Sequence, residues 1–133
     1  MAQFRLEIIT PDGPIFDGLV DSLLVRTVEG DVEILRGHAD YFAALAVGRA
    51  RILIGKEARY AAVSGGFLSV SGGEVKLVPV TVEFKESIDE ARALSAKERA
   101  TEALESAKDD KAIEIAKAKL SRALCRLNVA SLK

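Results

Sequence analysis

The hydrophobic pattern of this 133-residue chain changes its period once, over residues 83–93, and this change constrains the fold more than any other feature. Before it, apolar residues alternate with polar ones or form short runs between glycines, as in β-strands. After it, they recur every three or four residues, as in helices that bury one face. The sequence therefore predicts an α+β chain, with a β-rich domain at residues 1–84 and a helical domain at residues 85–133.

Turn residues divide the β-rich domain into short segments rich in Val, Ile and Leu. Phe4, Leu6 and Ile8 alternate with polar residues and mark the first strand, which a Pro and Gly turn closes. About ten such segments are typical of a β-sandwich or a small barrel, and we expect a sandwich. The pair Gly65 and Gly66 indicates either positive φ angles or a backbone held against a neighbour.

Two helices are predicted after the change of period. The first, over residues 88–107, is expected to begin after a capping box formed by Ser87 and Glu90, whose side chains satisfy backbone N–H groups at the helix start. The second, over about residues 111–129, follows the capping pair Asp109–Asp110. Two adjacent helices with a short connection are expected to pack as an antiparallel hairpin.

The seam between the two helices is predicted to consist mainly of small residues. They are Ala93, Ala96, Ala100, Ala103 and Ala107 on the first helix, and Ile113, Ala116, Leu120, Ala123, Leu127 and Ala130 on the second. A buried Leu contributes roughly 1.5 to 3 kcal/mol and each methylene about 0.8 kcal/mol, so an alanine seam holds the hairpin by a modest margin. A partner could open such a hairpin and a ligand could lock it.

Composition excludes several classes of protein. Lys and Arg number 19 against 20 Asp and Glu, so the net charge of −1 gives no argument for nucleic acid. The single Cys125 excludes an intrachain disulfide and suits a reducing compartment. No signal-peptide pattern opens the sequence, and its longest apolar run, residues 41–47, is far shorter than the roughly 20 residues of a membrane span. Direct membrane insertion is not expected.

Catalytic patterns are also missing from the sequence. There is no Gly-x-Ser-x-Gly elbow, no phosphate loop and no spacing typical of metal ligands. His38 is the only histidine, so it has no second histidine for a zinc site, and no nucleophile is identified for it to activate. The sequence predicts a protein that is not an enzyme and has no metal site.

Four arginines are the charged feature most suggestive of a ligand. Arg92 and Arg99 share a face of the first helix, and Arg122 and Arg126 share a face of the second. An antiparallel hairpin brings the two pairs together, and guanidinium forks match phosphate oxygens in bidentate fashion. A solvated basic face with ordinary surface ion pairs is the alternative.

Three stretches and a C-terminal helical hairpin, in this order, resemble the epsilon subunit of the bacterial F-type ATP synthase. The stretches are Thr10–Pro14, Gly30–His38 and Val63–Val70. The resemblance implies a sandwich seated on the rotor, beside the gamma subunit and the c-ring, at the cytoplasmic face of the bacterial plasma membrane. It also implies that the hairpin either folds on the sandwich or extends along gamma towards the alpha and beta subunits, where it inhibits ATP hydrolysis.

Several bacterial members of this family bind ATP through an Ile/Leu-Asp-x-x-Arg-Ala motif, which residues 88–93 match. The resemblance implies a regulatory ATP site, with or without Mg, formed by Glu83, Ile88, Asp89, Ala91, Arg92, Ala93, Arg99, Arg122 and Arg126. We expect Glu83, Asp89 and Arg92 at the nucleoside and the other three arginines at the phosphates. Because the arginines cannot bind ATP and an acidic surface at once, ATP is expected to favour the folded, non-inhibitory hairpin.

The expected rotor interface includes Glu33, Arg36 and His38. Where the family usually has Gly-Ile-Leu-Pro-Gly-His-x-Pro, this chain has Glu33-Ile34-Leu35-Arg36-Gly37-His38-Ala39-Asp40. Losing one glycine and two prolines changes the freedom of this loop. Two other classes stay open: a stand-alone ligand-binding sandwich with a helical oligomerisation tail, and a hydrolase on a β scaffold, against which the missing catalytic residues argue.

Overall fold

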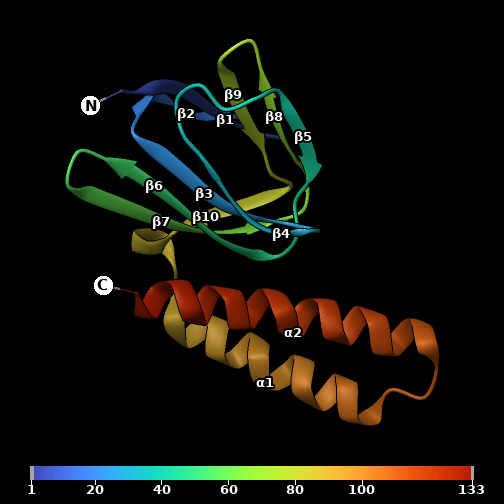
Figure 1. Ribbon diagram of the computed structural model, residues 1–133. Helices are drawn as coiled ribbons and strands as arrows, with labels where there is room; N and C mark the ends of the chain where they lie inside the picture. The colour runs from blue at the N-terminus through green and yellow to red at the C-terminus, as the bar shows by residue number, and fades with distance from the viewer. Residues whose placement is uncertain (1, 133) are drawn as a thin grey trace.

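The computed structural model describes residues 2–132, and over this range ten strands form two stacked sheets that are followed by two packed helices (Figure 1). The first sheet has the order β2 (Gly13–Val20), β1 (Phe4–Thr10), β9 (Glu74–Val78), β8 (Phe67–Ser71), β5 (Tyr41–Ala44). The second has the order β10 (Thr81–Phe84), β7 (Glu57–Ser64), β6 (Gly48–Ile54), β3 (Ser22–Thr27), β4 (Gly30–Ile34). The predicted fold class is confirmed. Met1 and Lys133, the outermost residues of the two predicted domains, lie outside the described range.

The core between the sheets is built from the alternating residues that marked the strands. On β1, Phe4, Leu6 and Ile8 are buried, whereas Arg5 is exposed. The largest fully buried side chains of the other strands are aliphatic as well: Val20, Leu23, Val25, Ile34, Ile52, Leu68 and Leu77. This burial of large apolar side chains is the main stabilising contribution to the sandwich.

The segment between β7 and β8 carries the chain from one sheet to the other. Gly65 and Gly66 both have positive φ angles, of 70° and 86°. A Cβ atom on Gly66 would lie 1.9 Å from the carbonyl oxygen of Val78, a distance that no side chain could tolerate. Both features expected of the paired glycines, positive φ angles and a backbone held against a neighbour, are therefore confirmed.

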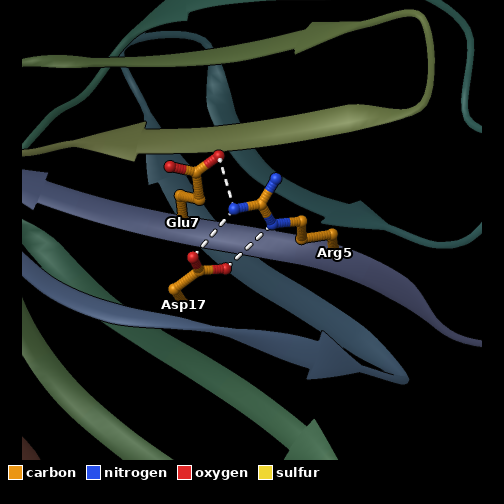
Figure 2. A network of polar contacts seen from close by, with 3 residues as sticks. All are labelled: Arg5, Glu7 and Asp17. Atoms are coloured by element: carbon orange, nitrogen blue, oxygen red, sulfur yellow. Dashed lines mark hydrogen bonds and ion pairs between the residues drawn. The ribbon is translucent and has the colours of Figure 1, made fainter.

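A charged network lies on the outer surface of the first sheet (Figure 2). Arg5 on β1 donates from Nε and Nη2 to the two carboxylate oxygens of Asp17 on β2, at 2.9 and 2.8 Å. Glu7 lies 3.7 Å from the same guanidinium. The hydrogen bonds and the charge of Arg5 hold the pKa of the Asp17 carboxyl below its usual value.

The start of the helical region differs from the prediction. A 3-10 turn, η1 (Lys85–Ser87), comes first, and α1 (Glu90–Ser106) begins two residues later than expected. Asp89, not Ser87, caps α1, because its side chain accepts a hydrogen bond from the N–H of Arg92 at 3.1 Å. Ile88 is extended, with φ −78° and ψ 123°, so Ser87 cannot reach the first helical turn and the predicted capping box is wrong.

The second helix agrees with the prediction. In α2 (Asp110–Ser131), the Asp109 side chain accepts a hydrogen bond from the N–H of Ala112 at 2.7 Å, as an N-cap should. The helices are antiparallel, and α2 lies between the sandwich and α1 (Figure 1). It packs against β6 and β7 of the second sheet.

Small residues form most of the buried helix seam. Ala93 and Ala100 on α1 and Ala116 and Ala123 on α2 are buried, as predicted. Ala103 is exposed, so its predicted place in the seam is wrong. Outside the seam prediction, Val129 near the end of α2 is also fully buried, and it is the one large aliphatic residue among the fully buried side chains of the described helices.

Candidate functional site

A cavity of about 410 Å³ lies at the root of the hairpin, where four elements meet. It is lined by Glu83 from β10, Ser87 from η1, Asp89, Arg92, Ala93, Ala96 and Arg99 from the start of α1, and Arg126 from α2. We call it the root cavity. The fold thus brings together six of the predicted site residues: Glu83, Asp89, Arg92, Ala93, Arg99 and Arg126.

A second cavity, of about 450 Å³, continues along the hairpin. Its lining is Ala96, Arg99, Ala100 and Ala103 from α1, and Lys119, Arg122 and Arg126 from α2. We call it the basic cavity, because it is lined by four cationic side chains and by no acidic one. It shares Ala96, Arg99 and Arg126 with the root cavity, so the two cavities are adjacent, and we refer to them together as the groove.

The helical period explains why these residues share a groove. Arg92, Ala96, Arg99 and Ala103 follow each other at steps of three or four, which places them on one face of α1. Lys119, Arg122 and Arg126 do the same on α2. Alanines on the α1 face leave the space into which the long cationic side chains of both helices reach.

The position of Glu83 follows from strand alternation. Its neighbours Val82 and Phe84 pack against the sandwich core, so Glu83 faces the opposite side of β10, towards the hairpin. The guanidinium of Arg59 lies 4.1 Å from the centre of the Phe84 ring, a cation–π contact that holds the end of the strand. The carboxylate of Glu83 is therefore presented from the sandwich.

The hairpin arginines are not held by ion pairs within residues 2–132. All ion pairs in that range belong to the sandwich: Arg5 with Glu7 and Asp17, Arg26 with Asp31, and Arg51 with Glu33. Arg99 donates to the hydroxyl of Ser95 at 2.8 Å, and the hydrogen-bonded partner of Asp89 is the backbone of Arg92. The surface ion pairs that the alternative of a solvated basic face includes are therefore not observed among the described residues, and guanidinium groups gathered in this way can bind an anion.

A third cavity, of about 300 Å³, separates α2 from the second sheet. Cys125, Arg122 and Arg126 line it together with Glu83 and mostly apolar residues of the sheet. Burial raises the pKa of the Cys125 thiol, an effect partly offset by a hydrogen bond with the backbone of Val63 and by the charge of Arg126. Burial therefore disfavours the thiolate form of Cys125.

Two predicted residues do not line any of these cavities. Ile88 is the half-buried link between η1 and α1, and its N–H donates to the carbonyl of Lys85 at 3.2 Å. Ala91 is exposed on the first turn of α1. Five lining residues were missed: Ser87, Ala96, Ala100, Ala103 and Lys119. The helical spacing from Arg92 and from Arg122 was the signal that could have found the last four.

The predicted rotor loop lies in the sandwich, between β4 and β5. Arg36 and His38 line a cavity of about 310 Å³, whereas Glu33 accepts a hydrogen bond from Arg51 at 2.9 Å. Asp40 accepts one from the N–H of Gly72 at 3.1 Å. The two acidic residues that replace a glycine and a proline of the family pattern thus fasten the loop to its neighbours.

Within the described part of the chain, no three His, Cys, Asp or Glu residues come close enough together to hold a metal ion. None of the described helices combines the length and the apolar character that crossing a membrane requires.

Two family matches together span nearly the whole sequence. Residues 3–85 match the family described as ATP synthase, Delta/Epsilon chain, beta-sandwich domain, and residues 86–131 match ATP synthase, Delta/Epsilon chain, long alpha-helix domain. The observed β-sandwich followed by α-helices agrees with these two descriptions. The chain therefore belongs to the Delta/Epsilon chain family of ATP synthase subunits.

Individual relatives identify the type of subunit more closely than the family match does. The ATP synthase epsilon chain of Bacillus velezensis is 42% identical over 130 residues, which are 98% of each chain. That of Halalkalibacterium halodurans is 41% identical over 132 residues, again 98% of each. The expected resemblance to bacterial epsilon chains is thus confirmed, and the subunit is a non-catalytic one of the F-type ATP synthase central stalk. The two alternative classes, a stand-alone ligand-binding sandwich and a hydrolase on a β scaffold, are therefore rejected.

Solved structures agree with this assignment. A chain of the Euglena gracilis mitochondrial ATP synthase, from the cryo-EM structure of OSCP/F1/c-ring in rotational state 1, superposes with a TM-score of 0.86 at 27% identity. The match covers 98% of this chain and 82% of that one. A chain from the central stalk/c-ring structure of the Tetrahymena thermophila enzyme gives a TM-score of 0.71 over 96% of both chains. At 14% identity, that likeness concerns the fold alone.

Proposed function

We propose that this subunit couples the catalytic head to the c-ring and that its hairpin is a conditional inhibitor of ATP hydrolysis, released by ATP. Residues 1–84 act as the rotor-binding domain and residues 85–133 as the regulatory domain. The complex lies at the cytoplasmic face of the bacterial plasma membrane, where this chain is peripheral. The observation that carries the ATP site is the groove of the root and basic cavities, in which seven predicted residues converge, four of them arginines without ion pairs among the described residues.

The distribution of charge supports the orientation of ATP in this groove. Glu83 and Asp89, the two acidic lining residues, both belong to the root cavity, where they offer hydrogen-bond acceptors to a nucleoside. The basic cavity is lined by Arg99, Arg122 and Arg126 and repels no phosphate. The nucleoside accordingly binds at the root, beside Arg92, and the phosphates extend along the hairpin.

ATP regulates the hairpin because its site exists only when the hairpin is folded. Arg92 and Arg99 belong to α1, Arg122 and Arg126 to α2, and Glu83 to the sandwich. Extending the hairpin separates these groups, so ATP stabilises the folded form by RT ln(1 + [L]/Kd). The inhibitory form instead presents the basic side chains of α2, including Lys117, to acidic surfaces of the alpha and beta subunits.

Equilibrium dialysis of ATP, with and without Mg, against the full chain tests the site. We expect Arg92→Ala and Arg126→Ala each to weaken binding about tenfold or more, because a hydrogen bond to a charged group contributes about 1.5 to 3 kcal/mol. Lys117→Ala is the matched control, since Lys117 is an exposed cation of α2 outside the groove. Undiminished binding by both arginine variants rejects the proposal.

Two surfaces of the sandwich support the rotor contact. Arg36 and His38 lie on the loop that Asp40 fastens to Gly72. On the first sheet, which the hairpin does not cover, Phe42 and Phe67 stack with ring centres 5.2 Å apart, and Phe42 is 69% exposed. Exposed apolar side chains of this size suit a protein partner, here the gamma subunit.

Co-purification of the assembled complex tests the rotor contact. We expect a Phe42→Ser variant and an Arg36→Ala, His38→Ala double variant to lose gamma and c-ring subunits during washing at high salt. Exposed Lys56→Ala, in the turn between β6 and β7, is the control. Retention equal to that of the control for both variants assigns the rotor contact to another face of the sandwich.

A further inference from the structure

Lys119 is the cation of the groove that the nucleotide motif does not account for. It lines the basic cavity with Arg99, Arg122 and Arg126, yet it precedes the nearest motif-associated residue, Arg122, by three positions. We propose that Lys119 contacts the terminal phosphate and makes the site select a triphosphate over a diphosphate. The inference rests on the proposed nucleotide function and assigns a specificity-determining residue to it.

The position of Lys119 along the groove argues for a terminal contact. Because α2 runs from the outer turn of the hairpin back to the sandwich, lower residue numbers lie further from the root (Figure 1). Lys119 precedes Arg126 by seven residues, which is about 10 Å along a helix axis. The groove therefore runs from Glu83 and Asp89, through the shared Arg99 and Arg126, to Lys119 at its far end.

Charge fixes the direction in which a polyphosphate lies. Of the two cavities of the groove, only the root cavity is lined by the carboxylates of Glu83 and Asp89, so a phosphate chain placed there meets like charge. The basic cavity has four cationic side chains and no acidic lining residue. A nucleotide seated with its nucleoside at the root thus extends its phosphates towards Lys119.

The number of phosphates then determines whether Lys119 is engaged. Arg99 and Arg126 belong to both cavities and can meet the phosphates nearest the nucleoside, and Arg122 meets the next. The flexible stem and point charge of a lysine suit the last phosphate, which is the most exposed and carries the most charge. A diphosphate ends before it reaches this position. The exposed floor formed by Ala103 leaves the space that a terminal phosphate requires.

Titration calorimetry of the full chain with ATP, ADP, inorganic tripolyphosphate and pyrophosphate tests the inference. We expect Lys119→Ala to weaken ATP and tripolyphosphate binding about fivefold, the size of a partly exposed charge contact of about 1 kcal/mol. Binding of ADP and pyrophosphate should change less than about twofold. Lys119→Arg should restore the preference for the triphosphate, and the exposed Lys117→Ala should keep it.

Equal losses for the triphosphates and the diphosphates, or no loss for either, overturn the role of Lys119. The two inorganic probes separate this outcome from a failure of the proposed function. If wild type binds tripolyphosphate in a Lys119-dependent way but does not bind ATP, the contact stands and the nucleotide function falls. If wild type binds none of the four ligands, both are rejected.

Discussion

The sandwich and the hairpin bury different kinds of side chain. Between the sheets, Leu6, Leu23, Ile52, Leu68 and Leu77 are at most 1% exposed, and they fill the space between two surfaces that face each other along their whole length. Between the helices, the buried residues are mostly alanines, which remove little apolar area from water. We therefore expect the hairpin to open at a lower free-energy cost than the sandwich.

The sandwich and the hairpin also differ in whether their charged side chains form ion pairs. The sandwich pairs its charges, as in the bidentate contact of Arg5 with Asp17 and in the contacts of Arg26 and Arg51. The hairpin gathers Arg92, Arg99, Arg122 and Arg126 around a groove without ion pairs among the described residues. A small anion can substantially stabilise a weakly held region that carries unneutralised charge, and this is why we propose that the switch lies in the hairpin.

The largest effect should follow from a cavity in the sandwich. Leu68→Ala removes a side chain that is fully buried between the sheets, so we expect the free energy of unfolding to fall by about 2 to 5 kcal/mol. Urea unfolding monitored by circular dichroism measures this loss. Leu124→Ala, at a position on α2 that is 44% exposed, is the control and should cost much less. Equal losses would mean that the two regions share one core.

A smaller and local effect should follow from overfilling the helix seam. Ala100→Leu adds three carbon atoms at a buried position, which typically costs about 1 to 3 kcal/mol. Hydrogen exchange should accelerate over residues 90–131 and stay unchanged in the strands. Ala118→Leu, on the exposed side of α2, should leave exchange unaltered. Faster exchange in the strands of the Ala100→Leu variant would show that the hairpin does not open independently.

The N-cap of α1 should give a third, still smaller effect. Asp89→Ala removes the side chain that accepts from the N–H of Arg92, and loss of such a cap costs about 0.5 to 2 kcal/mol. Exchange of the Arg92 amide should therefore accelerate. Ser87→Ala should leave it unchanged, because Ser87 belongs to the preceding 3-10 turn. If Ser87→Ala accelerated that exchange as much, the capping box of the sequence prediction would apply in solution.

The fold was predictable where local pattern and global packing agree. Alternation of Phe4, Leu6 and Ile8 identified a strand with one buried face, and the glycine pair at 65–66 identified a place where two backbones approach. The cap of α1 was not predictable, because Ser87 and Asp89 are about equally good caps. The extended backbone of Ile88 decides between them, and the pattern of side chains in the sequence does not specify that conformation.

The candidate site was predictable only in part, for a related reason. Helical spacing places Arg92 with Arg99 and Arg122 with Arg126, and an antiparallel turn brings the pairs together. Helical spacing does not determine which side of the hairpin is exposed to solvent. The exposure of Ala103 and the reach of Lys119 depend on how the two helices are rotated about their axes, which tertiary packing sets.

The smallest predicted effect concerns the ion pair of Arg5 with Asp17, which represents the paired charges of the sandwich. The hydrogen bonds and charge of Arg5 hold the pKa of Asp17 below its usual value, so the folded state favours the ionised carboxylate. This stabilisation is present above the unfolded pKa, about 4, and is lost as pH falls through the lower folded value. In urea titrations between about pH 6 and pH 2, wild type should therefore lose slightly more stability than Asp17→Asn. The difference should shrink in 1 M salt, because both groups are exposed. Identical pH dependence of the two proteins would mean that the contact in Figure 2 contributes nothing to the sandwich in solution.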